Sequence, residues 1–370
     1  MRRLAIHAGT LRGLGSAVVG KNLLLAMAGL DDGPELLAWV PAEWGFDPTA
    51  GGGRLTVRTT RPGVAAKLVL ESAALRRGLA RFRADALLSL GDTSVPYCAI
   101  PHVLFVQQAY LAYAPAALDF PLPRRFRLKM RAMAAWLEVG LRTTDRVIVQ
   151  SEHMRQAFAA RWGYPLHRLF VVPSTVQHEA LDPPLPDDAE SGRRPWLSYV
   201  SSAGPHKNHE VLAPMMEALR PRHPELRCRL TVRQDAVPGL VARAERLGVL
   251  DRFEFEGAVP AVEAMAMVRG AAAVVVPSRL ESFGIPYYEA MALGRPIVAA
   301  DRLCAREALG EAALYAPADD GHAFAAQVAS LLDAPAQAAR LASAARERFL
   351  EHQMTWPRIA RAMLDVVRSL

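Results

Sequence analysis

The sequence predicts an α/β protein built from two doubly wound domains with a cleft between them. Three observations lead to this fold class. Short apolar segments alternate with longer helical patterns in both halves of the chain, a proline-rich acidic segment at 179–192 separates the halves, and 370 residues with 51% hydrophobic content can form two cores. Strands joined by helices of about 10–15 residues imply parallel sheets with helices on both faces.

The first domain is expected to cover residues 1–178, which begin with an apolar segment followed directly by a helical pattern. Strands are expected at residues 4–8, 36–40, 55–59, 86–90, 103–107, 147–150 and 170–172. Helices are expected at residues 16–28, 64–83, 124–143 and 152–162.

The second domain is expected to cover residues 195–354, where the same alternation returns. Strands are expected at residues 197–201, 229–232, 253–255, 273–276, 297–300 and 313–315. Helices are expected at residues 209–219, 239–247, 261–269, 287–293 and 322–332. Ligands of such sheets bind outside the carboxyl ends of the strands, so the loops after these strands are the first places to search for a site.

Composition limits the class of protein before any motif is considered. The net charge of +7 favours an anionic partner, such as a nucleotide, an acidic lipid surface or a nucleic acid. The cysteines Cys98, Cys228 and Cys304 are far apart and form no Cys-x-x-Cys pair, so neither a disulfide framework nor a structural zinc site is expected. No apolar run reaches the ~20 residues that span a bilayer, and the first residues lack a signal-peptide core. We therefore expect a cytoplasmic protein.

Two glutamates bracket the most informative loop of the chain. Glu281 and Glu289 flank a helix start that follows the apolar strand at 273–276, with Gly284 and Pro286 between them. A helix N-terminus offers free N–H groups and a positive dipole end to an anion, while carboxylates accept hydrogen bonds from sugar hydroxyls. A loop that binds a phosphate group next to sugar hydroxyls suggests a nucleotide sugar as the ligand. In the alternative interpretation, Glu289 only complements the helix dipole and Glu281 is a solvated loop charge.

A second loop, at residues 201–209, follows the strand expected at 197–201. Lys207 lies at its end, just before a helix for which Asn208 is a candidate cap. A lysine at this place can offset phosphate charge next to free N–H groups. The alternative is an ordinary solvated lysine. The spacing of His206 and His209 is only a weak indication of a metal site, and the sequence offers no third ligand for it. No metal site is therefore expected.

A glycine-containing turn at residues 10–16 links the first strand to the first helix. Gly13 and Gly15 make it similar to an anion-binding loop, but Val18 stands where a full Gly-x-Gly-x-x-Gly motif has glycine. The alternative is a tight strand-to-helix turn. No acidic residue ends the second strand as a dinucleotide-dependent dehydrogenase requires, so this chemistry is not supported.

Residues 124–141 form a basic amphipathic helix. Its apolar stripe consists of Phe126, Met130, Met133, Leu137 and Leu141, and five arginine and lysine residues crowd its first turns. This pattern suits an anionic membrane surface. The alternative, which we favour for the stripe, is a domain helix that buries the stripe in the core and leaves its basic residues in water.

The motifs of several other functional classes are absent from the sequence. The sequence has no Gly-x-Ser-x-Gly elbow, no His-Glu-x-x-His segment and no complete Walker loop. Aromatic residues are not interleaved with the basic cluster as single-stranded nucleic-acid binding would require, so no nucleic-acid partner is expected.

The segment 277–299, with its paired glutamates, resembles the donor signature of the retaining glycosyltransferases of family 4, the glycosyl transferases group 1. Residues 204–208 resemble the family's donor-phosphate lysine loop, and 147–152 resemble the end of a strand in its first domain. Residues 352–370 resemble its terminal helix, so we expect 355–370 to pack back on the first domain. The resemblance implies the GT-B architecture, with two Rossmann-like domains, an acceptor site in the first and a nucleotide-sugar site in the second.

The resemblance also implies roles for individual residues. Glu289 would bind the ribose hydroxyls and Lys207 the diphosphate. Glu281 would contact the transferred sugar and, with Lys207, belong to the catalytic residues. Further donor contacts are implied for Phe283, Gly284, Ile285 and Ser202, and, on the evidence of the glycine turn, for Gly13 and Gly15. The reaction would retain anomeric configuration, through departure of the diphosphate and attack on the same face, with no metal and no other cofactor.

Three positions depart from the family pattern. Ser202 stands where many members carry arginine, which leaves more of the phosphate contact to Lys207. Gln107 stands where many members carry histidine on the acceptor side; it can form hydrogen bonds but cannot carry a proton. Residues 174–175 read Ser-Thr where the family has Asn-Gly.

We therefore expect a metal-independent hexosyltransferase, with mannose as the first candidate sugar. Its acceptor would be a cell-surface polysaccharide, such as lipopolysaccharide, or a lipid-linked glycan. The protein would work in the cytoplasm or at the inner face of the cell membrane, with residues 124–141 on the anionic surface. Two alternatives stay open: a sugar-nucleotide 2-epimerase of the same architecture, and a non-catalytic membrane- or glycan-binding relative.

Overall fold

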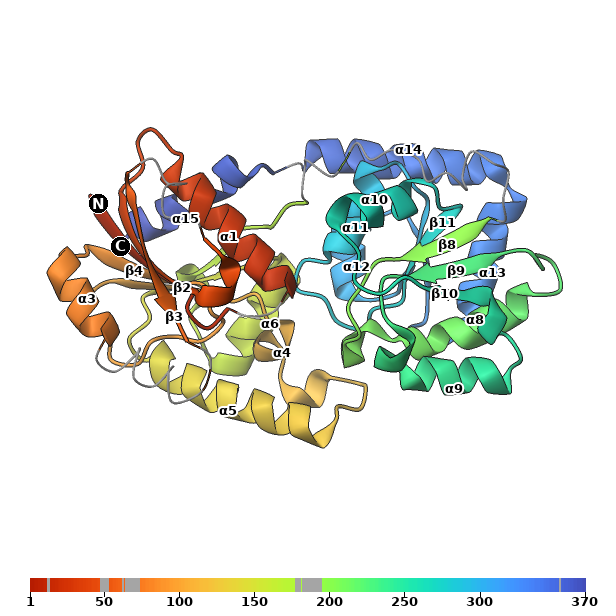
Figure 1. Ribbon diagram of the computed structural model, residues 1–370, viewed down its shortest axis with the longest axis horizontal. Coiled ribbons are helices and arrows are strands. Elements are labelled where there is room, and N and C mark those ends of the chain that lie inside the picture. The colour runs from red at the N-terminus through yellow and green to blue at the C-terminus, as the bar shows by residue number, and fades with distance from the viewer. Residues whose placement is uncertain are drawn as a thin grey trace. The chain divides into compact units, whose positions relative to one another are not determined.

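A computed structural model describes residues 1–11, 14–46, 53–61, 63, 74–176, 181, 195–352 and 354–370 (Figure 1). The chain divides into two compact units. The first comprises Met1–Ser174 together with Met354–Leu370, and the second comprises Thr175–Gln353. The segment expected to link the domains, 179–192, lies outside the described residues except for Leu181.

The first unit is built on a parallel sheet of seven strands in the order β3-β2-β1-β4-β5-β6-β7. These strands are β1 (Arg3–His7), β2 (Glu35–Pro41), β3 (Leu55–Thr60), β4 (Ala86–Ser89), β5 (His102–Phe105), β6 (Arg146–Val149) and β7 (Leu169–Val171). Strand numbers increase outward from β1 on one side of the sheet and from β4 on the other. The winding of the chain therefore reverses between β1 and β4.

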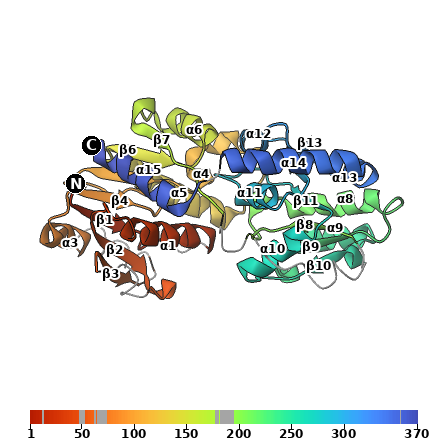
Figure 2. The same ribbon diagram turned by 90° about the horizontal axis from the view of Figure 1, so that it is seen from above.

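Helices cover both faces of the first sheet because its apolar side chains alternate between the faces. Leu4 and Ile6 pack in one core with α1 (Leu14–Ala28) and α15 (Trp356–Arg368), which lie side by side (Figure 2). Ala5, between them in sequence, packs on the opposite face. The helices of that face are α3 (Leu75–Phe82), α4 (Ala109–Ala112), α5 (Arg124–Leu141) and α6 (Glu152–Trp162).

The second unit is built on a parallel sheet in the order β10-β9-β8-β11-β12-β13. Its strands are β8 (Trp196–Tyr199), β9 (Arg227–Leu230), β10 (Phe253–Phe255), β11 (Ala273–Val276), β12 (Ile297–Ala300) and β13 (Leu314–Ala316). Its helices are α8 (Leu212–Leu219), α9 (Pro238–Arg246), α10 (Ala261–Arg269), α11 (Ile285–Ala292), α12 (Leu303–Leu309), α13 (Gly321–Asp333) and α14 (Pro335–Glu351). Helix α8 contacts α9 and α13, whereas α11 contacts α10, α12 and α14.

Short 3₁₀ helices complete the connections. They are η1 (Ala42–Trp44), η4 (Pro115–Ala117), η5 (Leu166–Arg168), η7 (Pro205–Lys207), η8 (His209–Val211), η9 (Gln234–Ala236) and η10 (Leu250–Arg252). None of the helices in the described residues is long and apolar enough to cross a membrane.

The predicted α/β class with two doubly wound sheets is confirmed, and each expected strand is observed to within two residues at either end. Helices α4, α12 and α14 were not predicted. The sequence of α14 is rich in alanine and arginine, and it buries only the narrow stripe of Leu341, Ala345 and Phe349, so its apolar periodicity is weak. The first half of the helix expected at 64–83 lies outside the described residues, and its second half contains α3.

Candidate functional site

The two loops with the predicted donor residues follow neighbouring strands of the second sheet. Strands β8 and β11 lie side by side although two other strands separate them in the chain. A doubly wound sheet reverses its strand order at such a point, and ligands bind there outside the carboxyl ends of the strands. The loop after β8 carries Lys207, and the loop after β11 carries Glu281 and leads into α11. The sheet topology therefore brings both loops to one end of the unit.

Lys207 and Glu281 form a buried ion pair. The Lys207 ammonium donates a hydrogen bond to the Glu281 carboxylate, with Nζ 2.6 Å from Oε1. The two side chains are only 11% and 9% exposed. Burial by itself would raise the pKa of Glu281, but the positive charge of Lys207 and further hydrogen bonds outweigh it and hold this pKa below its ordinary value. The glutamate is therefore ionised at neutral pH.

A buried tyrosine fixes the lysine loop against the loop after β11. The Tyr199 hydroxyl, at the end of β8, donates to the main-chain carbonyl of Lys207 at 2.9 Å and lies 2.9 Å from the Ser278 hydroxyl. The main-chain N–H of Arg279 also donates to the carbonyl of His206 at 2.8 Å. These contacts position the ammonium, and sequence reasoning missed them. A tyrosine at the end of an apolar strand carries no signal that separates it from ordinary core residues.

The sequence suggested Asn208 as a helix cap, but in the structure its side chain has a different role. Its backbone adopts the left-handed conformation at φ +57°, and its side chain forms no capping bond to the following η8. Its amide nitrogen instead donates to the carbonyls of Pro277, at 3.1 Å, and Ala318, at 2.6 Å. Asn208 therefore joins the lysine loop to two other loops at the same end of the sheet.

Gly284 allows the tight start of α11. Its φ of +82° lies in the left-handed region, and a Cβ atom at this position would come within 2.3 Å of the Tyr287 ring. Ile285 opens the helix, where N–H groups lack intrahelical partners, and Pro286 contributes no donor. The ring of Phe283 stacks on Tyr288 with centroids 4.0 Å apart. The helix start is thus a rigid turn.

Glu289 lies one turn into α11 and differs from Glu281 in protonation. It is half-buried, and burial raises its pKa to about 7, against the opposing attraction of Lys207. The histidines nearby stay neutral at pH 7, since burial lowers the pKa of His206 to about 4 and of His209 to about 3, with the charge of Lys207 adding to both shifts. Lys207 therefore supplies the positive charge of this loop.

The remaining predicted donor residues do not join the Lys207–Glu281 pair in any contact that the structure describes. Ser202 is exposed, and its carbonyl accepts a hydrogen bond from the N–H of Gly204 at 2.9 Å. Gly13 lies outside the described residues. Gly15 is in the first turn of α1 in the other unit, and open space surrounds the position of a Cβ atom there. The donor roles of these three residues stay predictions.

Gln107, predicted on the acceptor side, lies just beyond the carboxyl end of β5. It is buried, its N–H donates to Asp92 at 2.6 Å, and its side-chain amide donates to the carbonyl of Leu90 at 3.3 Å. Asp92, in the loop after β4, also accepts from the N–H of Gln108 at 2.8 Å and has a φ of +64°. Asp92 thus shapes the loop around Gln107, a part that sequence reasoning did not assign to it.

The basic helix α5 buries part of its apolar stripe. Met130 and Leu137 are buried, and Leu137 packs in the core of the first unit with Met133 and Leu141 at its edge. Its basic residues are exposed. The stripe therefore follows the alternative that we favoured, a helix packed on its own domain. Across the described part of the chain, no group of three histidine, cysteine, aspartate or glutamate side chains is placed to hold a metal ion.

Residues 186–348 match the family described as glycosyl transferases group 1. These residues, in the second unit, are similar to that family. The match contains the loops of both Lys207 and Glu281, together with α11. The family suggested by the sequence motifs therefore also matches the part of the chain that carries the paired glutamates and the lysine loop.

Curated relatives match somewhat less than two thirds of the chain. A glycogen synthase of Mycobacterium tuberculosis is 29% identical over 246 residues, which are 64% of this chain and 56% of the relative. A D-inositol 3-phosphate glycosyltransferase of Xylanimonas cellulosilytica is 30% identical over 249 residues, which are 60% of this chain and 56% of the relative. The matched stretch thus spans little more than half the length of each relative.

Solved structures share the fold over the whole chain. The structure of Anabaena Alr3699/HepE in complex with UDP-glucose superposes with a TM-score of 0.76, covering 100% of both chains at 17% identity. This likeness supports the two-domain GT-B fold for this chain. The fold class expected from the sequence is confirmed at this level as well.

Proposed function

We propose that this protein is a metal-independent, retaining glycosyltransferase that takes a hexose from a nucleoside-diphosphate sugar. The observation that carries the proposal is the buried pair of Lys207 and Glu281 at the carboxyl ends of β8 and β11. An ammonium group beside a helix start suits a diphosphate, and a carboxylate held next to it suits the hydroxyls of the attached sugar. Glu289, further along α11, is the proposed partner of the ribose hydroxyls.

The ion pair has a consequence for donor binding. Glu281 neutralises Lys207 before any ligand arrives, so an incoming diphosphate has to compete with this carboxylate for the ammonium. When the bond between sugar and phosphate breaks, negative charge grows on the leaving diphosphate. Lys207 and the N-terminus of α11 then stabilise that charge more strongly than they stabilise the ground state, which lowers the barrier. The acceptor attacks on the face from which the diphosphate departs, and configuration is retained.

The related proteins guide the choice of substrates. The structure of Alr3699/HepE contains UDP-glucose, so UDP-hexoses are the first donors to test, and mannose donors follow because of the sequence resemblance. The relatives are named for glycogen and for D-inositol 3-phosphate, which are chemically different acceptors. We propose a cell-surface polysaccharide, lipopolysaccharide or a lipid-linked glycan as the acceptor, with Gln107 on the acceptor side. The protein would then work in the cytoplasm, peripheral to an anionic membrane surface that α5 contacts.

Donor binding is tested by thermal shift with a panel of nucleoside diphosphates and their sugars, since a ligand of the folded state raises the melting temperature. With the best donor, Lys207→Ala and Glu289→Ala are expected to lower turnover at least about tenfold while the fold is kept. Glu263→Ala, an exposed glutamate of α10, is the control and should leave turnover unchanged.

Three results would decide against the proposal. Wild-type turnover in both Lys207→Ala and Glu289→Ala would remove the donor site from these loops. Release of a changed nucleotide sugar from donor alone, without an acceptor, would identify a sugar-nucleotide 2-epimerase. Liposome binding with no affinity for any nucleotide would identify a non-catalytic relative.

A further inference from the structure

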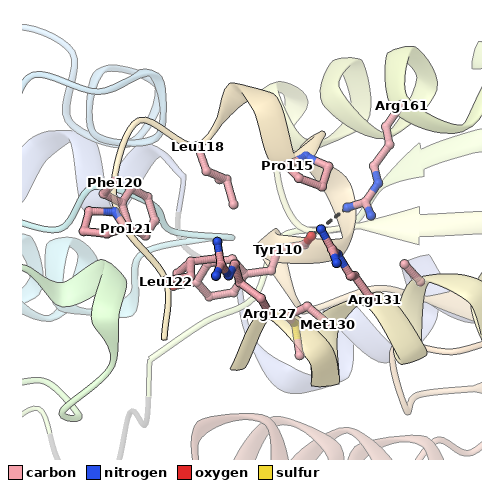
Figure 3. Close-up of a pocket in the computed structure, with 11 residues that line it drawn as sticks. Tyr110, Pro115, Leu118, Phe120, Pro121, Leu122, Arg127, Met130, Arg131 and Arg161 are labelled. Carbon is pink, nitrogen blue, oxygen red and sulfur yellow. Dashed lines mark hydrogen bonds between the residues drawn. The ribbon is translucent and has the colours of Figure 1, made fainter. Parts of the chain in front are cut away.

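A hollow in the first unit has no part in the donor chemistry. It has a volume of about 300 Å³ and lies between α4, α5 and the segment 115–122 that connects them (Figure 3). This volume is at the lower end of the range found for small-molecule sites, roughly 300–1,000 Å³. The hollow is therefore large enough for a charged group and a short apolar segment.

Apolar side chains form one part of its wall. Leu118 and Leu122 come from the connecting segment, and Met130 comes from α5. Phe120 is buried, with its ring edge-on to Tyr110 at a centroid distance of 6.3 Å. Pro115 and Pro121 restrict the backbone of the segment, which lowers the entropy lost when a ligand is bound. This wall suits an aliphatic chain.

Three arginines form the other part. Arg127 and Arg131 are four residues apart on α5, so they lie on one face of the helix, and Arg161 reaches in from α6. Arg161 donates to the carbonyls of Tyr110 and Tyr113, both at 2.7 Å, which fixes its guanidinium group. In Figure 3, Arg131 and Arg161 point toward one another. Positive charge is thus gathered at one side of an apolar hollow.

In the part of the chain that the structure describes, the two arginines of α5 that line the hollow have no acidic partner. Within the described ranges, neither Arg127 nor Arg131 forms an ion pair, whereas Arg279 and Arg306 in the second unit pair with aspartates. Like charges that line one hollow repel each other, and a bound anion removes this repulsion. The hollow therefore has the charge of a site that takes an anion.

We propose that this hollow binds a phosphate-bearing lipid, with the phosphate on Arg127 and Arg131 and the first carbons of the aliphatic chain against Leu118, Leu122 and Met130. Guanidinium groups match phosphate oxygens in paired hydrogen bonds. A phosphate monoester carries nearly two negative charges at pH 7, which suits several arginines better than the single charge of a carboxylate. The proposal goes beyond the donor site, because it concerns a separate site in the other unit and requires no nucleotide.

Helix α5 provides its own matched control. Residues 127, 130, 131 and 134 recur at helical spacing and line the hollow. By the same periodicity, Arg125 and Lys129 lie on the opposite face, and both are exposed. A double substitution on either face removes two charges from the same helix, so general attraction to anions falls equally in both variants. Any difference in ligand affinity between the two variants is therefore due to the side chains that line the hollow.

Calorimetric titration of the full chain with dodecyl phosphate, below its micellar concentration and without nucleotide, tests the proposal. Arg127→Gln/Arg131→Gln is expected to weaken binding about tenfold or more, as expected for loss of charge-assisted hydrogen bonds. Arg125→Gln/Lys129→Gln is expected to change it less than about twofold. Equal effects in the two double variants, or no effect in either, would overturn the proposal.

A second set of ligands separates a lipid from free phosphate. Leu122→Ser should weaken dodecyl phosphate several-fold and leave inorganic phosphate unchanged, because only the alkyl chain contacts the apolar wall. Dodecyl maltoside, which has the chain without the charge, should bind much more weakly than dodecyl phosphate. Inorganic phosphate binding as tightly as dodecyl phosphate would contradict a lipid site. These titrations contain no sugar nucleotide. Their outcome therefore does not bear on the donor-site proposal, which has a separate test.

Discussion

At the scale of single residues, the close pairing of Lys207 and Glu281 gives one carboxylate two opposing effects. It holds the ammonium in place, and it also neutralises the charge that the proposed binding of a diphosphate requires. Removing the carboxylate charge should therefore separate nucleotide affinity from turnover. A lysine and a glutamate 74 residues apart reveal nothing of this competition in the sequence, because it depends on the 2.6 Å approach that the fold creates.

We expect Glu281→Gln to bind nucleoside diphosphate several-fold more tightly than the wild type and to turn over donor at least about tenfold more slowly. Glutamine keeps the shape of the side chain but leaves Lys207 with a full positive charge for the phosphates. Calorimetry with UDP and a turnover assay measure the two effects. Glu254→Gln, which breaks the 2.6 Å ion pair of Glu254 with Arg229, is the control and should change neither. Weaker UDP binding by Glu281→Gln would show that Glu281 does not compete for Lys207.

Glu289 should give the proposed donor site a pH dependence near neutrality. Its pKa in the folded protein, about 7, lies above its ordinary value of 4.5. The folded state therefore binds more protons than the unfolded chain between these two values, and the contribution of Glu289 to stability is lost as the pH rises through this window. Ribose hydroxyls donate best to the ionised carboxylate, so the affinity for a donor moves in the opposite direction from stability.

Affinity for the nucleotide sugar is expected to rise between pH 6 and pH 8 and to stay constant over this range in Glu289→Gln. A nucleotide sugar is the suitable ligand because its diphosphate has no proton to lose in this range. His206 and His209 do not interfere, since their pKa values of about 4 and 3 keep them neutral. Calorimetric titration at several pH values measures the effect. The same rise in Glu289→Gln as in the wild type would assign the titration to another group.

At the scale of elements, the sequence predicted the strands and most helices because buried parallel strands are short continuous apolar runs. It also located the loops of the proposed donor site, since a glycine and a proline mark the start of α11. It did not predict the Tyr199 and Asn208 contacts that join those loops. Both depend on residues far apart in the chain, such as Asn208 and Ala318, which only the finished sheet brings together.

The start of α11 is expected to be sensitive to a single methyl group. Gly284→Ala combines a left-handed φ of +82° with a Cβ atom 2.3 Å from the Tyr287 ring, so we expect a loss of stability above about 1 kcal/mol and a weaker donor affinity. Gly294→Ala, at the other end of α11, has a φ of +60° but no atom within 4 Å, so it tests the backbone strain alone. Thermal unfolding and donor titration compare them. Equal losses of stability and affinity in the two variants would show that the Tyr287 contact has no effect.

At the scale of the whole molecule, the chain returns to its first unit after completing the second. Helix α15 contributes Ile359, Met363, Leu364 and Val367 to the core that also contains β1 and α1. The sequence indicated this return only through the family resemblance, because the apolar stripe of an amphipathic helix does not specify which sheet it covers. The stability of the first unit should therefore depend on the last residues of the chain, while the proposed donor contacts around Lys207 lie in the other unit.

Leu364→Ala is expected to lower the stability of the first unit by about 2–5 kcal/mol, because it leaves a cavity beneath a fully buried side chain. Arg361→Ala on the same helix breaks only an exposed ion pair with Asp32, at 3.1 Å, and is expected to cost at most about 1 kcal/mol. Denaturant unfolding measures both losses. Nucleotide affinity at low temperature should equal that of the wild type in both variants, since every proposed contact that the structure places near Lys207 lies between residues 175 and 353. A loss of nucleotide affinity in Leu364→Ala below its unfolding transition would mean that the donor site depends on the core of the first unit.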